Sequence, residues 1–216
     1  MAKTTLEPGS FNIDSISFDL TNYVQKIKQN DKYGWLDEEK GVANLLRFNS
    51  ERASWTFKVN ELDKASQFYG EQCSAAGGAV LVLKNIEVDG SEALYGIFKY
   101  RAKPGQMPLM YVGIIWIPFD NCIYQINVES LEQGTTGTRE AAIMLKLGDD
   151  WPMSDEPAVV VKTAEELFSR MRNAKLRVLP SDREEYDELF PEHPLTKVRA
   201  RLQKILDTVK FEAPNN

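Results

Sequence analysis

The feature that most constrains the fold is a series of four apolar segments between residues 79 and 128, separated by short turn signals. Asp89-Gly90 is a strong two-residue hairpin signal. Lys103-Pro104-Gly105 and Asp120-Asn121 mark two further turns. Short connections of this kind join antiparallel strands, because parallel strands need a long crossover. We therefore predict an α+β fold, with an antiparallel sheet of four or more strands packed by helices.

The four segments differ in how their apolar residues are placed. Met110–Ile117 is apolar almost throughout, so we expect it to be central and covered on both faces. Cys122–Val128 alternates apolar and polar residues, which predicts one dry and one solvated face. The other two expected strands are Ala79–Val88 and Glu92–Arg101, and the aromatic residues of this sheet fit core packing better than base stacking.

The preceding residues are more varied. We expect strands at 11–18, 42–48 and 53–59, and a polar loop at 31–41. Residues 21–30 are ambiguous, with some helical character. A helix should begin at Asn60 as the N-cap and end before Gly77-Gly78.

The amino-acid composition of the chain changes after Gly148. We predict a flexible lead-in at residues 1–10, an α+β core domain at 11–148, and an acidic linker with a mainly helical C-terminal extension at 149–216. Thr163 with Glu166, and Ser181 with Glu184, predict two helix starts. Residues 176–179 are expected to form a short strand.

The last predicted helix, which begins near Pro194, carries one apolar stripe. Its members recur at steps of three and four residues: Leu195, Val198, Leu202, Ile205, Leu206 and Val209. We favour docking of this stripe on its own domain or across a homodimer. The alternative is a helix that binds a partner protein through the same six residues.

Composition excludes several classes of function. The net charge of −6 argues against general binding to nucleic acid. No apolar run approaches the roughly 20 residues of a membrane helix, and the first eight residues show no secretory signal. Cys73 and Cys122 are far apart and fit small buried side chains better than a disulfide. These features predict a cytoplasmic protein without membrane or nucleic-acid contacts.

One loop is a candidate for binding an anion or phosphate ligand. It lies between a predicted strand and a predicted helix and consists of Gly134, Thr135, Thr136, Gly137, Thr138 and Arg139. It lacks the Gly-Lys-Ser/Thr ending of a P-loop. If it binds a ligand, we expect a concave pocket with Arg139 at its rim. The other interpretation is a glycine turn with threonine capping.

No catalytic residue, metal site or cofactor is predicted. His193 is the only histidine, and it could not form an ordinary zinc site with two distant cysteines unless carboxylates contributed. Adjacent acids such as Asp149-Asp150 and Glu184-Glu185 fit solvated charge better than paired catalytic carboxylates. An enzyme is therefore the less favoured expectation.

The order of a helix at 60–75, the hairpin series and a helix at 138–147 resembles the PsbP/DcrB-like fold over residues 11–147. The resemblance implies a non-enzymatic binding protein, since similar members include photosystem subunits, a nuclear-transport factor and chaperones of type VI secretion effectors. Our leading hypothesis is a cytoplasmic protein-binding module of the adaptor, secretion-chaperone or immunity type, with another protein or a second copy as partner. The alternative is a small enzyme or anion-binding protein that uses the loop at 134–139.

Overall fold

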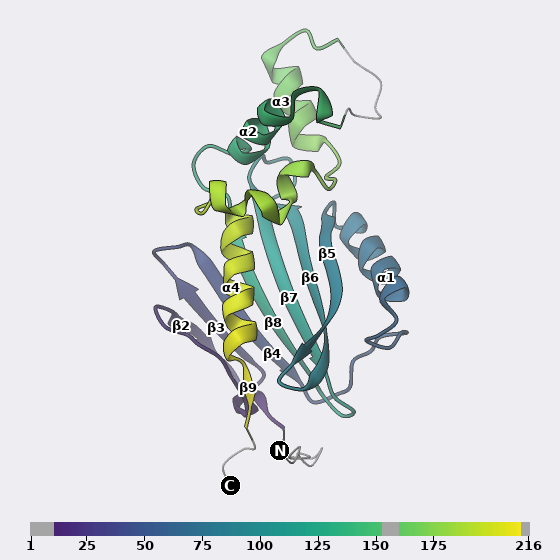
Figure 1. Ribbon diagram of the computed structural model, residues 1–216, viewed down its shortest axis with the longest axis vertical. Helices are drawn as coiled ribbons and strands as arrows, with labels where there is room; N and C mark the ends of the chain where they lie inside the picture. The colour runs from purple at the N-terminus through teal and green to yellow at the C-terminus, as the bar shows by residue number, and fades with distance from the viewer. Residues whose placement is uncertain (1–10, 153–159, 213–216) are drawn as a thin grey trace.

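The computed structural model describes residues 11–152 and 160–212. Its centre is a seven-stranded antiparallel sheet in the order β2-β3-β4-β8-β7-β6-β5 (Figure 1). The strands are β2 (Val24–Lys28), β3 (Lys32–Asp37), β4 (Val42–Asn49), β5 (Ala79–Val88), β6 (Ser91–Arg101), β7 (Leu109–Pro118) and β8 (Ile123–Leu131). The α+β class and the antiparallel sheet are therefore confirmed.

The sheet consists of two meanders joined by one long-range pairing. β5 to β8 follow one another through the three predicted turns. β8 then pairs with β4, with Leu46 opposite Ile126. This pairing places β8 in the middle of the sheet. β7 is an interior strand with buried residues in both hydrophobic clusters, as its continuous apolar pattern predicted.

Three predictions for the N-terminal part are wrong. Residues 32–37 form β3 instead of a loop, since pairing with both β2 and β4 satisfies its backbone and Tyr33 and Trp35 pack against the core. Residues 53–59 form no strand; Trp55 instead donates a hydrogen bond to the Tyr69 hydroxyl at 2.9 Å. In segment 11–18, Asn12 caps the 3₁₀ turn η1 (Ile13–Ser15), which leaves only the two-residue strand β1 (Ile16–Ser17).

In the described parts of the chain, the sheet is accompanied by the α-helices α1 (Leu62–Ala75), α2 (Thr138–Leu147), α3 (Ala164–Asn173) and α4 (Pro194–Thr208). Glu61 and not Asn60 is the N-cap of α1, and its side chain makes no capping hydrogen bond. Besides η1, the described 3₁₀ turns are η2 (Gly148–Asp150), η3 (Pro180–Asp182) and η4 (Glu184–Leu189). Residues 176–179 form no strand, and the predicted helix start at Ser181 and Glu184 falls in the 3₁₀ turns η3 and η4 instead of an α-helix.

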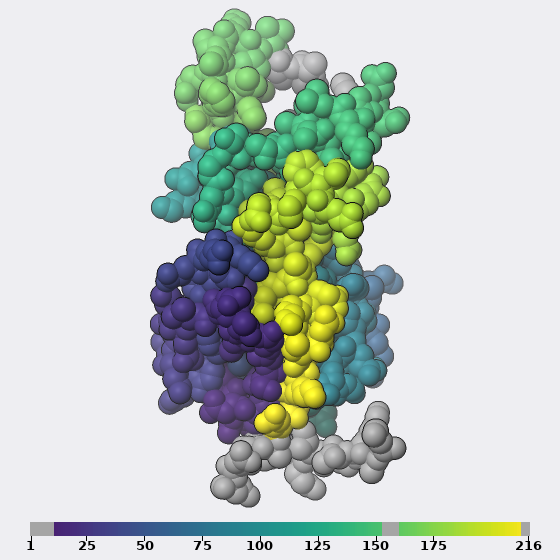
Figure 2. Space-filling model, turned by 60° about the vertical axis from the view of Figure 1, so that its left-hand side comes forward, coloured from purple at the N-terminus to yellow at the C-terminus, as the bar shows by residue number. Residues whose placement is uncertain are grey.

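The two longest helices lie on opposite faces of the sheet. α4 packs with residues such as Tyr95 and Ile115, whereas α1 packs with their neighbours Leu94 and Trp116. Adjacent strand residues point to opposite faces, so the molecule has helix, sheet and helix layers. Figure 2 shows α4 (yellow) running along the sheet between the N-terminal strands and the later ones. β9 (Lys210–Phe211) pairs with β1.

The predicted extension therefore shares the hydrophobic core with the predicted core domain. The division at residues 148 and 149 stays a prediction, and the lead-in at 1–10 and much of the acidic linker lie outside the described residues. α2 and α3 lie beyond one end of the sheet (Figure 1). In the described ranges, the model contains no helix with the length and apolar content needed to cross a membrane.

Candidate functional site

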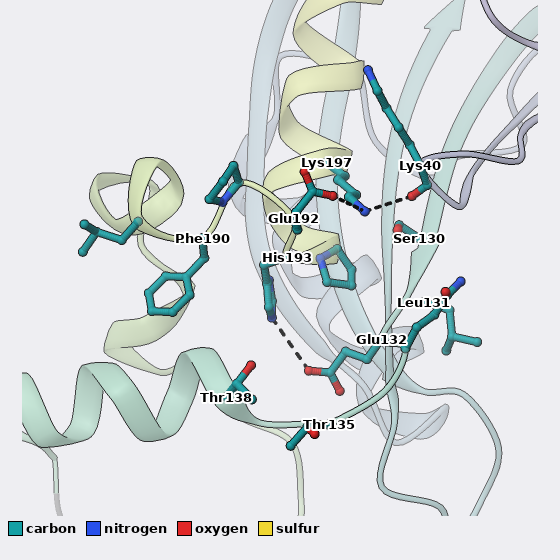
Figure 3. A pocket seen from close by; sticks show the side chains of 14 residues that line it. Lys40, Ser130, Leu131, Glu132, Thr135, Thr138, Phe190, Glu192, His193 and Lys197 are labelled. Atoms are coloured by element: carbon teal, nitrogen blue, oxygen red, sulfur yellow. Dashed lines mark hydrogen bonds and ion pairs between the residues drawn. The ribbon is translucent and has the colours of Figure 1, made fainter.

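A cavity of about 410 Å³ opens where the end of β8, the start of α2 and the start of α4 meet (Figure 3). Glu132 and His193 point toward each other in this cavity, and Thr135 and Thr138 line its α2 side. The end of β8 and the start of α2 are joined by the loop at 132–137, whereas α4 begins more than fifty residues later in the chain. The site therefore exists only because α4 docks on β7 and β8.

Glu132 is the first residue after β8 and is buried. Its Oε2 accepts a hydrogen bond from the backbone N–H of Leu109 at 2.8 Å, and its Oε1 accepts a longer one from Gly137 at 3.4 Å. Glu132 thereby connects the start of β7 with the loop before α2. Bonds of this kind stabilise the ionised carboxylate in a buried position.

His193 is the N-cap of α4 and is buried as well. Its Nδ1 accepts a hydrogen bond from the backbone N–H of Leu195 at 3.2 Å. In neutral His193 this contact leaves the ring proton on Nε2. Nε2 lies 3.7 Å from Oε1 of Glu132, which is too long for a good hydrogen bond, and the ring contacts the edge of Tyr111.

Glu140, in the first turn of α2, completes a cluster with these two residues. One potential ligand atom from each of Glu132, Glu140 and His193 lies within 4.8 Å of the others. Three buried atoms of this region have no hydrogen-bond partner among the described residues: His193 Nε2, Glu140 Oε2 and the Tyr111 hydroxyl. Burial raises the pKa of Tyr111 well above its ordinary value, and the nearby carboxylates of Glu140, Asp182 and Glu132 raise it further.

An ion pair between two further lining residues also borders the cavity. Lys197 forms an ion pair with Glu192 at 2.9 Å and donates a hydrogen bond to the backbone carbonyl of Lys40 at 3.1 Å (Figure 3). The ammonium group of Lys197 is thus held between α4 and the turn after β3.

The predicted anion loop lies beside this cavity, but Arg139 does not lie at its rim. The Arg139 side chain is fully buried under η3 and η4, where it donates hydrogen bonds to the backbone carbonyls of Ser181 at 2.6 Å and Arg183 at 2.8 Å. It also contacts the Thr196 hydroxyl and forms an ion pair with Asp187 at 2.8 Å. The geometric expectation for Arg139 was therefore wrong, because residues far along the chain provide its acceptors. Ligand binding by the rest of the loop stays a prediction.

The stripe of the terminal helix is buried against the sheet, as the favoured interpretation expected. Leu195, Val198, Leu202 and Ile205 are fully buried, Val209 is nearly so, and Leu206 packs at the edge of the same cluster. Recognition of a partner through these six residues stays a prediction, and it would require α4 to leave the sheet.

We did not expect Glu132, Glu140 and His193 to meet. The two glutamates flank the Gly/Thr loop, and His193 lies more than fifty residues further on, before a helix-starting proline. The feature of the sequence that could have indicated this site was the pair of glutamates on either side of the Gly/Thr loop. Nothing local connected that pair with the histidine, because the docking of α4 brings them together.

A different surface is apolar and exposed. α3 presents Leu167, Phe168 and Met171, and Val160 and Val161 precede this helix. On α2, Leu145 is 81% exposed and Met144 is also exposed. The aromatic residues of the sheet are mostly buried, as the core interpretation predicted.

No protein-family model matches the sequence, and no curated protein matches it. Among solved structures, the fold is similar to that of the Ran-binding protein Mog1p of Saccharomyces cerevisiae, with a TM-score of 0.47 and 10% identity over 91% of this chain and 90% of that chain. It is also similar to cyanobacterial PsbP (CyanoP) from Synechocystis sp. PCC 6803, with a TM-score of 0.41 and 5% identity over 64% of this chain and 85% of that chain. The structural neighbours thus include a PsbP protein, as the sequence led us to expect, and the likeness is one of the arrangement of helices and strands alone.

Proposed function

We propose that this protein is a non-enzymatic protein-binding module whose partner binds the apolar face of α3. That face consists of Leu167, Phe168 and Met171, which are 45%, 48% and 43% exposed. None of the residues of α3 is buried. An isolated helix of this length is marginal in water, and most helices gain their stability by burying an apolar face. The unburied face of α3 is the observation that carries the proposal.

The charge around this face indicates what kind of partner fits. Residues 162–178 contain five basic side chains and two acidic ones, in a chain whose net charge is −6. Glu165 pairs with Arg172 at 2.7 Å, and Glu166 pairs with Arg170 at 3.6 Å. The remaining excess is positive. A partner with an apolar groove bordered by carboxylates would match both the shape and the charge of α3.

α3 is attached to the sheet at its C-terminal end. The guanidinium group of Arg101, the last residue of β6, donates hydrogen bonds to the backbone carbonyls of Met171 at 2.7 Å and Ala174 at 3.1 Å. These carbonyls are among those that a helix leaves unpaired at its end. The attachment uses the backbone of α3 and leaves its apolar side chains exposed, as a presented interface requires.

Affinity purification of the tagged full-length protein from its native cells tests this proposal. The Phe168→Ser/Met171→Ser variant should lose a stoichiometric partner that the wild type retains. Val24→Ser changes an exposed apolar residue on the edge strand β2 and should retain that partner. A partner retained equally by both variants, or no stoichiometric partner of the wild type, would contradict the proposal.

The identity of the captured protein assigns the finer role. We propose a cytoplasmic adaptor, secretion chaperone or immunity-type protein; an effector passed to a secretion machine indicates the chaperone, and a toxin indicates the immunity protein. Light scattering after size-exclusion chromatography tests the remaining partner, a second copy of the chain. A dimer that becomes monomeric in the Phe168→Ser/Met171→Ser variant would make α3 a homodimer interface.

A further inference from the structure

We propose that Glu132, Glu140 and His193 bind one divalent metal ion of the Zn²⁺ class. The three residues come from the end of β8, the first turn of α2 and the N-cap of α4. One potential ligand atom from each lies within 4.8 Å of the others. In a tetrahedral zinc site, bonds of about 2.0–2.2 Å place neighbouring ligand atoms roughly 3.3–3.6 Å apart. Small side-chain rotations toward a common centre would therefore complete the site.

The unpartnered atoms provide a second, independent observation. Nε2 of His193 and Oε2 of Glu140 are buried and make no hydrogen bond within the described part of the chain. His193 is only 9% exposed, and its Nε2 is directed at the Glu132 carboxylate (Figure 3). Buried polar atoms nearly always have a partner. One ion between these side chains would satisfy both atoms.

The charge of the cluster favours a cation. Among the described residues, neither Glu132 nor Glu140 forms an ion pair with a lysine or arginine, and Glu132 has only the distant contact with His193. Arg139 is next to Glu140 in the chain, but its guanidinium contacts Ser181, Arg183, Thr196 and Asp187. Glu132 is buried and Glu140 is partly buried, and carboxylates that are removed from water without a countercharge are costly. A divalent ion would neutralise them.

The ligand set selects the class of metal. One imidazole with two carboxylates suits Zn²⁺, since imidazole is a preferred ligand of this ion. Mg²⁺ and Ca²⁺ prefer oxygen ligands alone. The cavity of about 410 Å³ is lined by Glu132 and His193, so an ion can enter from solvent, and a water molecule has room to be the fourth ligand.

Metal binding has a structural consequence for α4. A neutral histidine that binds metal through Nε2 carries its proton on Nδ1. Nδ1 of His193 then cannot accept the hydrogen bond from the Leu195 N–H. We therefore expect the Leu195 amide to change its environment when metal binds. A site that excluded His193 would leave this amide unaffected.

Isothermal titration of the metal-stripped full-length protein with zinc chloride tests the proposal, with magnesium chloride as the comparison ion. We expect one bound Zn²⁺ per chain, at least about tenfold weaker binding in Glu140→Gln and in His193→Gln, and little response to Mg²⁺. Glu192→Gln lies at the mouth of the same cavity and should bind Zn²⁺ like the wild type. Leu195 should shift in ¹H–¹⁵N spectra during the titration.

Two results would overturn the proposal. The first is no binding of Zn²⁺ at metal concentrations up to about 100 μM, which is about 100 times a dissociation constant of 1 μM. The second is equal Zn²⁺ affinity of the wild type and Glu140→Gln. The first result would leave a buried water as the partner of the cluster. If His193→Gln fails to fold, Glu140→Gln and the Leu195 signal still decide the question. Neither readout depends on the partner-binding surface on α3.

Discussion

The ammonium group of Lys99, in β6, forms an ion pair with the carboxylate of Asp182, in η3, at 2.7 Å, and both side chains are almost completely buried. The same carboxylate accepts a hydrogen bond from the backbone N–H of Leu179 at 2.7 Å. This pair connects the segment before α4 to β6 of the sheet. Together with the contacts of Arg139, it positions the start of α4 and therefore His193.

Removing one member of this pair should be strongly destabilising. Lys99→Met leaves the Asp182 carboxylate buried without its countercharge, and we expect a loss of about 3–5 kcal/mol in the free energy of unfolding. The Lys99→Met/Asp182→Leu double variant should recover part of that loss. Lys64→Met removes the exposed pair with Glu61 and should cost less than about 1 kcal/mol. Urea denaturation measures the free energy of unfolding of all three variants. Similar losses for Lys64→Met and Lys99→Met would contradict a structural role of the buried pair.

The docking of α4 predicts a contrast between two leucine substitutions. Leu202 is fully buried against the sheet, so Leu202→Ala should lower the free energy of unfolding by about 2–5 kcal/mol. Leu145→Ala, at an exposed position on α2, should change it by less than about 0.5 kcal/mol. If urea denaturation gave equally small losses for both variants, α4 would not be docked on the sheet in solution.

A close approach of α4 to β7 predicts the effect of adding one methyl group. A Cβ atom at Gly113 would clash with Leu202 and would lie 2.8 Å from Cγ1 of Val198. Gly113→Ala should therefore destabilise the protein by about 1–3 kcal/mol. Gly70 lies within α1 with no neighbour near its would-be Cβ, so Gly70→Ala should stabilise by up to about 1 kcal/mol. Thermal unfolding of the two variants should shift in opposite directions, and shifts of the same sign would refute this account.

Burial of Cys122 predicts a dependence of stability on alkaline pH. Burial raises the pKa of this thiol from its ordinary 9.0 to about 11. The unfolded chain therefore loses the thiol proton first as the pH rises. The contribution of the protonated Cys122 thiol to the free energy of unfolding is complete below about pH 9 and is lost between about pH 9 and pH 11.

Comparison with Cys122→Ala isolates this contribution. Between pH 8 and pH 10.5, the free energy of unfolding of the wild type should fall by up to about 2 kcal/mol more than that of the variant. Urea denaturation at both pH values measures the difference, and the other alkaline groups titrate in both proteins. Parallel pH profiles would show that Cys122 does not ionise in this range on unfolding.

Local patterns predicted the parts of the fold that depend on neighbouring residues. The hairpins of β5 to β8 follow from turn residues and side-chain alternation, which act over a few positions. The start of α3 follows from Thr163, whose hydroxyl accepts a hydrogen bond from the Glu166 N–H at 3.1 Å. The apolar stripe of α4 is likewise a property of its own spacing, and it predicted burial without naming the surface that covers it.

Only the tertiary structure decided which distant segments meet. β3 is a strand because β2 and β4 pair with it on both sides, although the polar residues that surround it led to the prediction of a loop at 31–41. Arg139 is buried because acceptors more than forty residues away surround its guanidinium group. Glu132, Glu140 and His193 form a cluster because α4 docks on β7 and β8. These outcomes depend on long-range pairing and packing, whose partners are not neighbours in the sequence, so periodicity and turn chemistry alone carry no information about them.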